Sequence, residues 1–192
     1  MTRLMDWLHE QAVFLSRFLI SPGQIGSVAP SSRELAETMV RPVAWEHIRT
    51  IAELGAGTGA ITRHIQSAAG VDTKVLLFEK DPYLRRKLKE RYPHYSCYTD
   101  GSHLRLFLKQ EGLESLDCII SGLPFFNFSQ YVRDRIITEI VAALNKDGLF
   151  IAFQYSQQMK KQLMEHFDII NIHFVPKNFP PAFVYVCRKK QI

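Results

Sequence analysis

Ile51-Ala-Glu-Leu-Gly-Ala-Gly-Thr-Gly-Ala-Ile-Thr62 is the stretch that decides the fold, because a short apolar run leads directly into three glycines at alternate positions. Residues 51–54 predict a buried strand, and the residues after Gly59 predict a helix. Glycine allows backbone angles and close approaches that a side chain forbids, so this turn can lie against a ligand. The stretch therefore predicts a nucleotide pocket at the carboxyl end of a strand.

The glycine spacing alone fits more than one class of enzyme. Gly55-Ala-Gly57-Thr-Gly59-Ala60 also satisfies the G-x-G-x-x-G/A pattern of dinucleotide-binding enzymes. The chain has 192 residues, which is enough for one well-buried domain but too short for a dinucleotide domain plus a separate substrate domain. Its length therefore counts against a typical dehydrogenase.

Acidic residues follow at three successive predicted strand ends. Glu53 lies two residues before the first glycine, and Glu79 closes the apolar run 75–78. A carboxylate about 20 residues after such glycines can accept hydrogen bonds from ribose hydroxyls. Asp100 follows the short predicted strand 95–98. Each acid alone is explained equally well as a solvated loop carboxylate or a helix cap, but three in this order favour a nucleotide site.

This arrangement resembles the class I methyltransferases that use S-adenosylmethionine (AdoMet). In that superfamily an acid near the position of Glu53 lies close to the amino-acid end of AdoMet, and a turn like Asp100-Gly-Ser102 meets the adenine. The resemblance implies an AdoMet site formed by Glu53, Gly55, Gly57, Gly59, Glu79, Lys80, Asp100, Gly101, Ser102 and Ser121.

The order of predicted elements agrees with such a fold. Strands at about 50–54, 75–79, 95–98, 117–121 and 148–153 alternate with helical stretches, which indicates a parallel sheet covered on both faces. Residues 167–175 and 182–188 are joined by a connection too short for a crossover helix, so they should pair antiparallel. We expect an α/β, Rossmann-like class I methyltransferase fold with a seven-stranded, mostly parallel sheet. We assign residues 1–32 to an N-terminal helix and serine loop of the same domain, and residues 33–192 to the AdoMet-binding part.

Composition restricts the partners. A formal net charge of +5 suits an anionic partner, either nucleic acid or an acidic membrane surface. No apolar stretch approaches the roughly 20 residues that cross a bilayer, and the N-terminus has no signal-peptide pattern, so we expect a cytoplasmic protein. Cys97, Cys118 and Cys187 lie in predicted strands without a C-x-x-C pair, so we expect buried thiols and no metal.

The N-terminal segment has two interpretations. At about 100° per residue, positions 3–19 form an amphipathic helix with Trp7, Phe14 and Phe18 on the apolar side. That side either packs over the ligand pocket or inserts into a lipid interface. A glycine-proline-serine loop follows and leads into a predicted helix at 33–40, where Ser31 and Glu34 suggest a capping box.

The turn after the fourth predicted strand reads Ser121-Gly-Leu-Pro-Phe-Phe126. In adenine-N6 methyltransferases, including the ribosomal RNA dimethylases, the related turn is Asn-Leu-Pro-Tyr/Phe, and the Asn carbonyl accepts a hydrogen bond from the adenine amine. Gly122 occupies that Asn position, which disfavours an RNA adenine substrate. Phe125, Phe126 and Phe128 are predicted to line the rim of the pocket as an apolar wall for an acyl chain or a cationic amine, unless they are ordinary core residues.

Five segments together resemble the soluble bacterial phospholipid N-methyltransferases, which methylate phosphatidylethanolamine. They are Gly26-Ser-Val-Ala-Pro-Ser-Ser32, Glu53-Leu-Gly-Ala-Gly-Thr-Gly59, Ser121-Gly-Leu-Pro124, Phe153-Gln-Tyr155 and Asn178-Phe-Pro-Pro-Ala182. The resemblance covers nearly the whole chain. It implies an AdoMet enzyme associated peripherally with the inner face of the cell membrane, contacting anionic lipid through its N-terminal helix.

We therefore expect methylation of the phosphatidylethanolamine amine, in successive steps toward phosphatidylcholine. Tyr155, at the end of the fifth predicted strand, and Asn178 are the candidate catalytic residues for contacting the acceptor. An rRNA adenine-N6 methyltransferase-like enzyme is the alternative, and a non-catalytic AdoMet-binding or membrane-interaction protein is a third hypothesis. We expect no nucleic-acid partner, and the sequence leaves the oligomeric state open.

Overall fold

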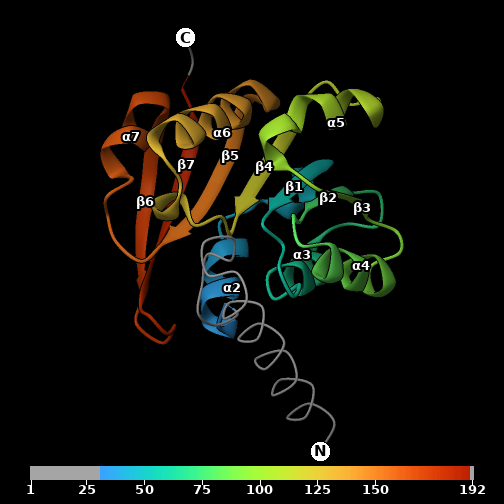
Figure 1. Cartoon of the computed structure of the whole chain (residues 1–192), viewed down its shortest axis with the longest axis horizontal. Coiled ribbons are helices and arrows are strands. Elements are labelled where there is room, and N and C mark those ends of the chain that lie inside the picture. The colour runs from blue at the N-terminus through green and yellow to red at the C-terminus, as the bar shows by residue number, and fades with distance from the viewer. Residues whose placement is uncertain (1–30, 191–192) are drawn as a thin grey trace, which may run out of the picture.

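Seven strands form one mixed sheet in the order β3-β2-β1-β4-β5-β7-β6 (Figure 1). The structure is a computed structural model that describes residues 31–190. Its strands are β1 (Thr50–Leu54), β2 (Lys74–Phe78), β3 (Ser96–Tyr98), β4 (Leu116–Ser121), β5 (Leu144–Gln154), β6 (Phe167–Val175) and β7 (Ala182–Lys189). The α-helices are α2 (Arg33–Val40), α3 (Thr62–Ala68), α4 (Pro82–Arg91), α5 (Leu104–Gln110), α6 (Gln130–Ala143) and α7 (Lys160–His166). Short 3-10 helices are η1 (Trp45–His47), η2 (Gly101–His103) and η3 (Phe125–Asn127).

The pairing confirms the predicted fold class. Strands β3, β2, β1, β4 and β5 pair in parallel, whereas β7 runs antiparallel to both β5 and β6. The parallel strands all end at one edge of the sheet, and their following turns are therefore neighbours in space. The β6–β7 hairpin also ends at this edge, because Gln154 at the end of β5 pairs with Phe183 at the start of β7.

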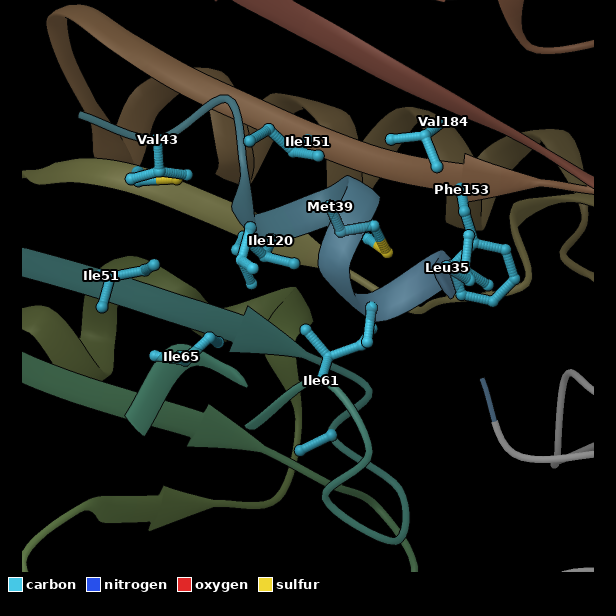
Figure 2. Packing of buried hydrophobic residues seen from close by; sticks show 14 of the residues in the cluster. Leu35, Met39, Val43, Ile51, Ile61, Ile65, Ile120, Ile151, Phe153 and Val184 are labelled. Carbon is cyan, nitrogen blue, oxygen red and sulfur yellow. The ribbon is translucent and has the colours of Figure 1, made fainter. Parts of the chain in front are cut away.

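Each face of the sheet packs against helices (Figure 1). Helices α2, α3 and α4 cover one face with strand residues such as Ile51 and Ile120, and α5, α6 and α7 cover the other. Figure 2 shows Leu35 of α2 beside Phe153 of β5, with Met39 of the same helix on the side nearer Ile120 of β4. All four side chains are buried. Burial on both faces explains why these strands are continuous apolar runs in the sequence.

Helix α2 begins at the predicted residue but with a different cap. Ser32, rather than Ser31, is the N-cap, and its Oγ accepts a hydrogen bond from Leu35 N at 3.1 Å. The predicted capping box of Ser31 and Glu34 is therefore wrong. Because the helix begins at Arg33, the N-cap is the residue before it, Ser32. A capping box also needs a polar side chain at the third helical position to accept a hydrogen bond from the N-cap backbone N–H, and that position is Leu35.

Strand β5 is longer than the predicted strand 148–153. It begins at Leu144, and its pairing with β4 shifts register between Leu116 and Cys118. The additional residues include Asn145, whose Nδ2 donates to Asp117 Oδ1 at 2.6 Å. A side chain bonded to the neighbouring strand holds this irregular start in the sheet, which a period-two apolar pattern does not reveal.

The cysteines lie in strands as predicted, but the prediction that all are buried is wrong for Cys97, which is half-buried because β3 is the edge strand of the sheet. Cys97, Cys118 and Cys187 are free thiols in β3, β4 and β7. The predicted N-terminal helix with Trp7, Phe14 and Phe18 lies outside the described residues, as does the predicted serine loop up to residue 30. Lipid contact by that helix and the division of the chain at residues 32 and 33 therefore stay predictions.

Candidate active site

The turn after β1 holds three glycines in left-handed backbone conformations. Their φ angles are 75° at Gly55, 55° at Gly57 and 85° at Gly59. The N–H groups of Gly55 and Ala56 donate to the carbonyl oxygen of Phe78 at 2.8 and 3.1 Å. These bonds fix the turn against the end of β2. Any other residue would be strained in this conformation, which is why glycine recurs here.

The space around the glycines identifies the open side of the turn. A Cβ atom at Gly55 would lie 3.1 Å from Leu123 Cδ2, and one at Gly59 would lie 3.2 Å from Tyr92 Cε2. At Gly57 the nearest atom would be the Gly55 carbonyl oxygen at 4.0 Å. Gly57 therefore faces open space, where a ligand can approach the backbone closely.

Glu53 is a fully buried carboxyl group at the end of β1. Its Oε2 accepts a hydrogen bond from Thr62 Oγ1 at 2.6 Å, while its Oε1 has no hydrogen-bond partner among the described residues. Burial raises the pKa of Glu53 to about 8; the bond from Thr62 opposes this, and the charge of Glu79 adds to it. A buried acceptor without a donor is unfavourable, so this oxygen is suited to a positively charged or hydrogen-bonding ligand group.

Glu79 follows β2 and links two parts of the pocket. Its Oε2 accepts from Gly57 N at 2.7 Å and its Oε1 accepts from Asp81 N at 2.8 Å. Burial raises the pKa of Glu79, although these backbone hydrogen bonds act in the opposite direction. Each carboxylate oxygen can accept two hydrogen bonds, so both oxygens keep capacity for ribose hydroxyls.

Asp100 caps the turn after β3. Its side chain accepts from Ser102 N at 2.8 Å. Burial opposes ionisation of Asp100, but the Ser102 hydrogen bonds and the nearby charge of Lys80 lower its pKa below the usual value. A Cβ atom at Gly101 would lie 3.0 Å from Leu54 Cδ2, so any other residue here would push the Leu54 side chain aside.

The structure places the predicted AdoMet-binding residues at one edge of the sheet. Ser121 at the end of β4 pairs with Leu54 at the end of β1, and Leu54 pairs with Phe78 at the end of β2. Ser121 is buried, and its Oγ accepts from Leu123 N at 3.2 Å. These pairings bring together residues that are far apart in the sequence. What each of them binds stays a prediction.

A cavity of about 190 Å³ opens beside these residues, after β4 and β5. None of its described lining residues carries a charge, and they are Gly122, Leu123, Pro124, Phe126, Asn127, Phe153, Gln154, Tyr155, Ser156 and Gln158. The cavity is therefore an uncharged site with several amide and hydroxyl groups. Its position next to the glycine turn suits a methyl acceptor.

Gly122 joins the cavity to the glycine turn. Its N–H donates to the Leu54 carbonyl oxygen at 2.8 Å. A Cβ atom at Gly122 would lie 3.0 Å from the Gly55 carbonyl oxygen, closer than side chains normally approach backbone oxygen. An Asn at this position would therefore press on the glycine turn. This contact is a physical reason for the departure from the Asn-Leu-Pro turn of the adenine enzymes.

The two candidate catalytic residues have different surroundings. Tyr155 lines the cavity, and its ring meets the ring of Phe153 edge-on at 5.7 Å between centroids. Asn178 is buried and lies outside the cavity lining. Its Oδ1 accepts from Ser32 N at 3.0 Å and its Nδ2 donates to Pro180 O at 2.7 Å. Asn178 therefore holds the β6–β7 loop against the start of α2, and Tyr155 is the better placed of the two to touch an acceptor.

The predicted phenylalanine rim is only partly present. Phe126 is 62% exposed and lines the cavity, but Phe125 is 1% exposed and packs in the core. The ring of Phe125 contacts the rings of Phe128 and Phe150, and Phe128 is itself half-buried. The prediction that all three line the rim is therefore wrong for Phe125 and for Phe128, which packs against the core and is absent from the cavity lining. In a 3-10 turn successive side chains point about 120° apart, so neighbours cannot share one wall.

Gln154 is a residue that the sequence interpretation did not single out. It ends β5, is buried, and lines the cavity. A glutamine that interrupts the buried run Phe150-Ile-Ala-Phe153 was the available signal, because a polar side chain in a buried strand needs a specific partner.

Comparison with known proteins gives the family. No protein-family model matches the chain. The chain is 34% identical over 181 residues to the ornithine lipid N-methyltransferase of Singulisphaera acidiphila, and the match covers 92% of this chain and 94% of that enzyme. The chain belongs to this methyltransferase family.

Solved structures agree with this methyltransferase assignment at the level of the fold. The N-methyltransferase NodS from Bradyrhizobium japonicum, in complex with S-adenosyl-L-homocysteine, has a TM-score of 0.66 at 12% identity, covering 81% of this chain and 83% of that one. A TehB-like AdoMet-dependent methyltransferase from Corynebacterium glutamicum has a TM-score of 0.63 at 18% identity, covering 95% and 99%. The methyltransferase described here is thus AdoMet-dependent and has the class I fold.

The residues present fit AdoMet. Gly57 opens on space that a side chain would enter, and Glu53 Oε1 lacks a donor among the described residues. Glu79 presents acceptor oxygens beside the same turn. The site therefore combines close backbone access with acceptors for a cationic, hydroxyl-bearing ligand.

Proposed function

We propose that the protein transfers methyl groups from AdoMet to the primary amine of a membrane aminolipid. The observation that carries this proposal is the 34% identity to an ornithine lipid N-methyltransferase over 94% of that enzyme. Ornithine lipids and phosphatidylethanolamine both present a primary amine on a polar headgroup. Phosphatidylethanolamine is the acceptor indicated by the sequence motifs, and an ornithine lipid is the acceptor indicated by the relative.

In this proposal the carboxyl edge of the sheet holds the cofactor. AdoMet supplies a methyl group bonded to a positively charged sulfur. Gly57 allows close approach of the backbone, Glu79 accepts from the ribose, and Asp100 lies at the adenine end. Glu53 lies toward the amino-acid end, where its unpartnered Oε1 receives a donor. The protein acts mainly by holding two reactants in line.

The acceptor cavity suits an amine that must lose a proton before it reacts. A primary alkyl ammonium has a pKa near that of lysine, about 10.4, and is not nucleophilic. An uncharged cavity does not stabilise the ammonium form, so entry favours the neutral amine. The exposed ring of Phe126 offers an apolar surface at the opening. Tyr155 is the candidate for a hydrogen bond to the acceptor.

A membrane-facing edge is also part of the proposal. Phe179, in the loop between β6 and β7, is 81% exposed, and Lys177 beside it is exposed as well. An aromatic ring next to a cation suits the interface of an anionic bilayer. In the described part of the chain no helix has the length and apolarity to span a membrane. We propose peripheral association with the cytoplasmic face through this edge, assisted by the predicted N-terminal helix.

RNA is the competing acceptor because the formal charge of +5 favours any polyanion. An assay with four separate acceptors distinguishes these possibilities. The protein and methyl-labelled AdoMet are incubated with vesicles containing ornithine lipid, vesicles containing phosphatidylethanolamine, vesicles of phosphatidylglycerol alone, or ribosomal RNA. We expect label in the lipid extract of one or both aminolipid vesicles and none in RNA. Label confined to RNA would reject the proposal.

A further inference from the structure

The side-chain amide of Gln154 has a fixed orientation. Its Nε2 donates to the Leu123 carbonyl oxygen at 3.0 Å and also to the Phe153 carbonyl oxygen. Both partners are acceptors only, so the amide nitrogen must face them and the amide oxygen must face away. The turn after β4 and the end of β5 therefore hold this amide in one position.

The amide oxygen of Gln154 has no donor among residues 31–190. The residue is 6% exposed, yet it lines the cavity beside the glycine turn. The hydrogen bonds of its side chain to the described residues both use Nε2. An amide oxygen that has no donor among the described residues, on a side chain that lines an uncharged cavity, is suited to a donor on a ligand.

We propose that Gln154 Oε1 accepts an N–H hydrogen bond from the acceptor amine and orients the nitrogen lone pair toward the methyl group. This inference rests on the proposed function. A neutral amide carbonyl stabilises the ammonium form of the acceptor less than a carboxylate would. Gln154 can therefore hold the amine without strongly raising the pKa of that amine. Gln154 at the end of β5 thus provides the amide acceptor that Gly122, directly after β4, cannot.

The number of N–H groups on the acceptor gives a specific consequence. An unmethylated neutral amine has two N–H groups, a monomethylated amine has one, and a dimethylated amine has none. The contact with Gln154 therefore assists the first and second transfers but not the third. A residue that only held the turn in place would assist all three equally.

The test compares Gln154→Met with Gln157→Met, an exposed glutamine nearby in the sequence that is absent from the cavity lining. Acceptors are the unmethylated and the dimethylated forms of the aminolipid that the wild type accepts. We expect Gln154→Met to lower kcat/KM about ten- to hundredfold on the unmethylated lipid, the usual effect of losing a hydrogen bond to a polar ligand. On the dimethylated lipid we expect an effect within about threefold, with AdoMet affinity unchanged. Equal losses on both lipids, or no loss on either, would overturn the inference.

A second measurement does not depend on the lipid. In ¹⁵N-labelled protein, the side-chain amide signal of Gln154 is assigned as the one missing from the spectrum of Gln154→Met. NMR then follows this signal while butylamine is added in the presence of S-adenosylhomocysteine. We expect this signal to shift and that of Gln157 to stay. If the Gln154 signal does not move, the proposed contact with the amine is rejected. If the signal moves but the protein methylates no aminolipid, only the proposed function is rejected.

Discussion

Replacing Glu53 with Gln tests the electrostatics of the cofactor site. The substitution keeps the size of the side chain and a polar partner for Thr62 Oγ1, which donates to Glu53 at 2.6 Å. It removes a carboxyl group whose pKa burial raises to about 8. In the unfolded chain the pKa of a glutamate is about 4.3. Between these two values the folded protein holds a proton that the unfolded chain has lost.

The sign of the effect follows from that proton. Because folding takes up a proton in this window, raising the pH opposes folding of the wild type, and the glutamine variant has no such group. Each pH unit corresponds to about 1.4 kcal/mol, so from about pH 6 to about pH 8 the variant should gain about 2 kcal/mol relative to the wild type. For a chain of this size that is about 4–8 °C in the melting midpoint.

This difference in stability is measured by thermal melts of both proteins without AdoMet at the two pH values, with circular dichroism as the probe. We expect the midpoint of Glu53→Gln to rise relative to the wild type as the pH increases. Calorimetry at the higher pH should show weaker AdoMet binding by the variant, because an amide lacks the negative charge that pairs with a cationic ligand. A constant offset between the melts at both pH values would refute the argument from burial.

Three further variants test other parts of the protein. Glu79→Ala should weaken AdoMet binding by about 1.5–3 kcal/mol through loss of a charged acceptor, with the fold retained, and unchanged affinity in calorimetry would reject the ribose assignment. Gly57→Val should abolish AdoMet binding. The control is Gly112→Val, at a remote glycine with a left-handed φ of 68° and no neighbour within 4 Å. This control should have similar backbone strain and still bind AdoMet. Changing Trp7 and Phe14 together to Asp should eliminate cosedimentation with anionic vesicles while AdoMet binding and the melting midpoint stay nearly constant; a destabilised protein that still binds vesicles would instead show that the helix packs in the core.

Much of the fold and of the cofactor site could be predicted because both depend on local sequence signals. Apolar runs bounded by glycine, proline or acidic residues gave the strands, and the short connection before Ala182 gave the antiparallel hairpin. Glu53, Glu79 and Asp100 were predicted to converge because the carboxyl ends of adjacent parallel strands share one edge. The structure places all three residues there.

The acceptor side depends on contacts between segments, and these are not visible in a local pattern. Whether Phe125 or Phe126 faces the cavity depends on the 3-10 turn that carries them. Within the described residues Gln154 Oε1 has no donor, because the carbonyl oxygens of Leu123, in the turn after β4, and of Phe153 both take the amide nitrogen. Asn178 was predicted as a catalytic residue from its motif, whereas its burial and its bond to Ser32 reflect the packing of a loop against α2.

The position of the transferred methyl group in the lipid tests the central proposal most directly. Aminolipid vesicles are labelled with methyl-labelled AdoMet and the purified protein, the lipid is hydrolysed, and the headgroup and fatty acids are separated. We expect all of the label on the headgroup nitrogen, as methylated ornithine or methylated ethanolamine. Label in the fatty-acid fraction, or no label in either aminolipid while ribosomal RNA is labelled, would contradict the proposal.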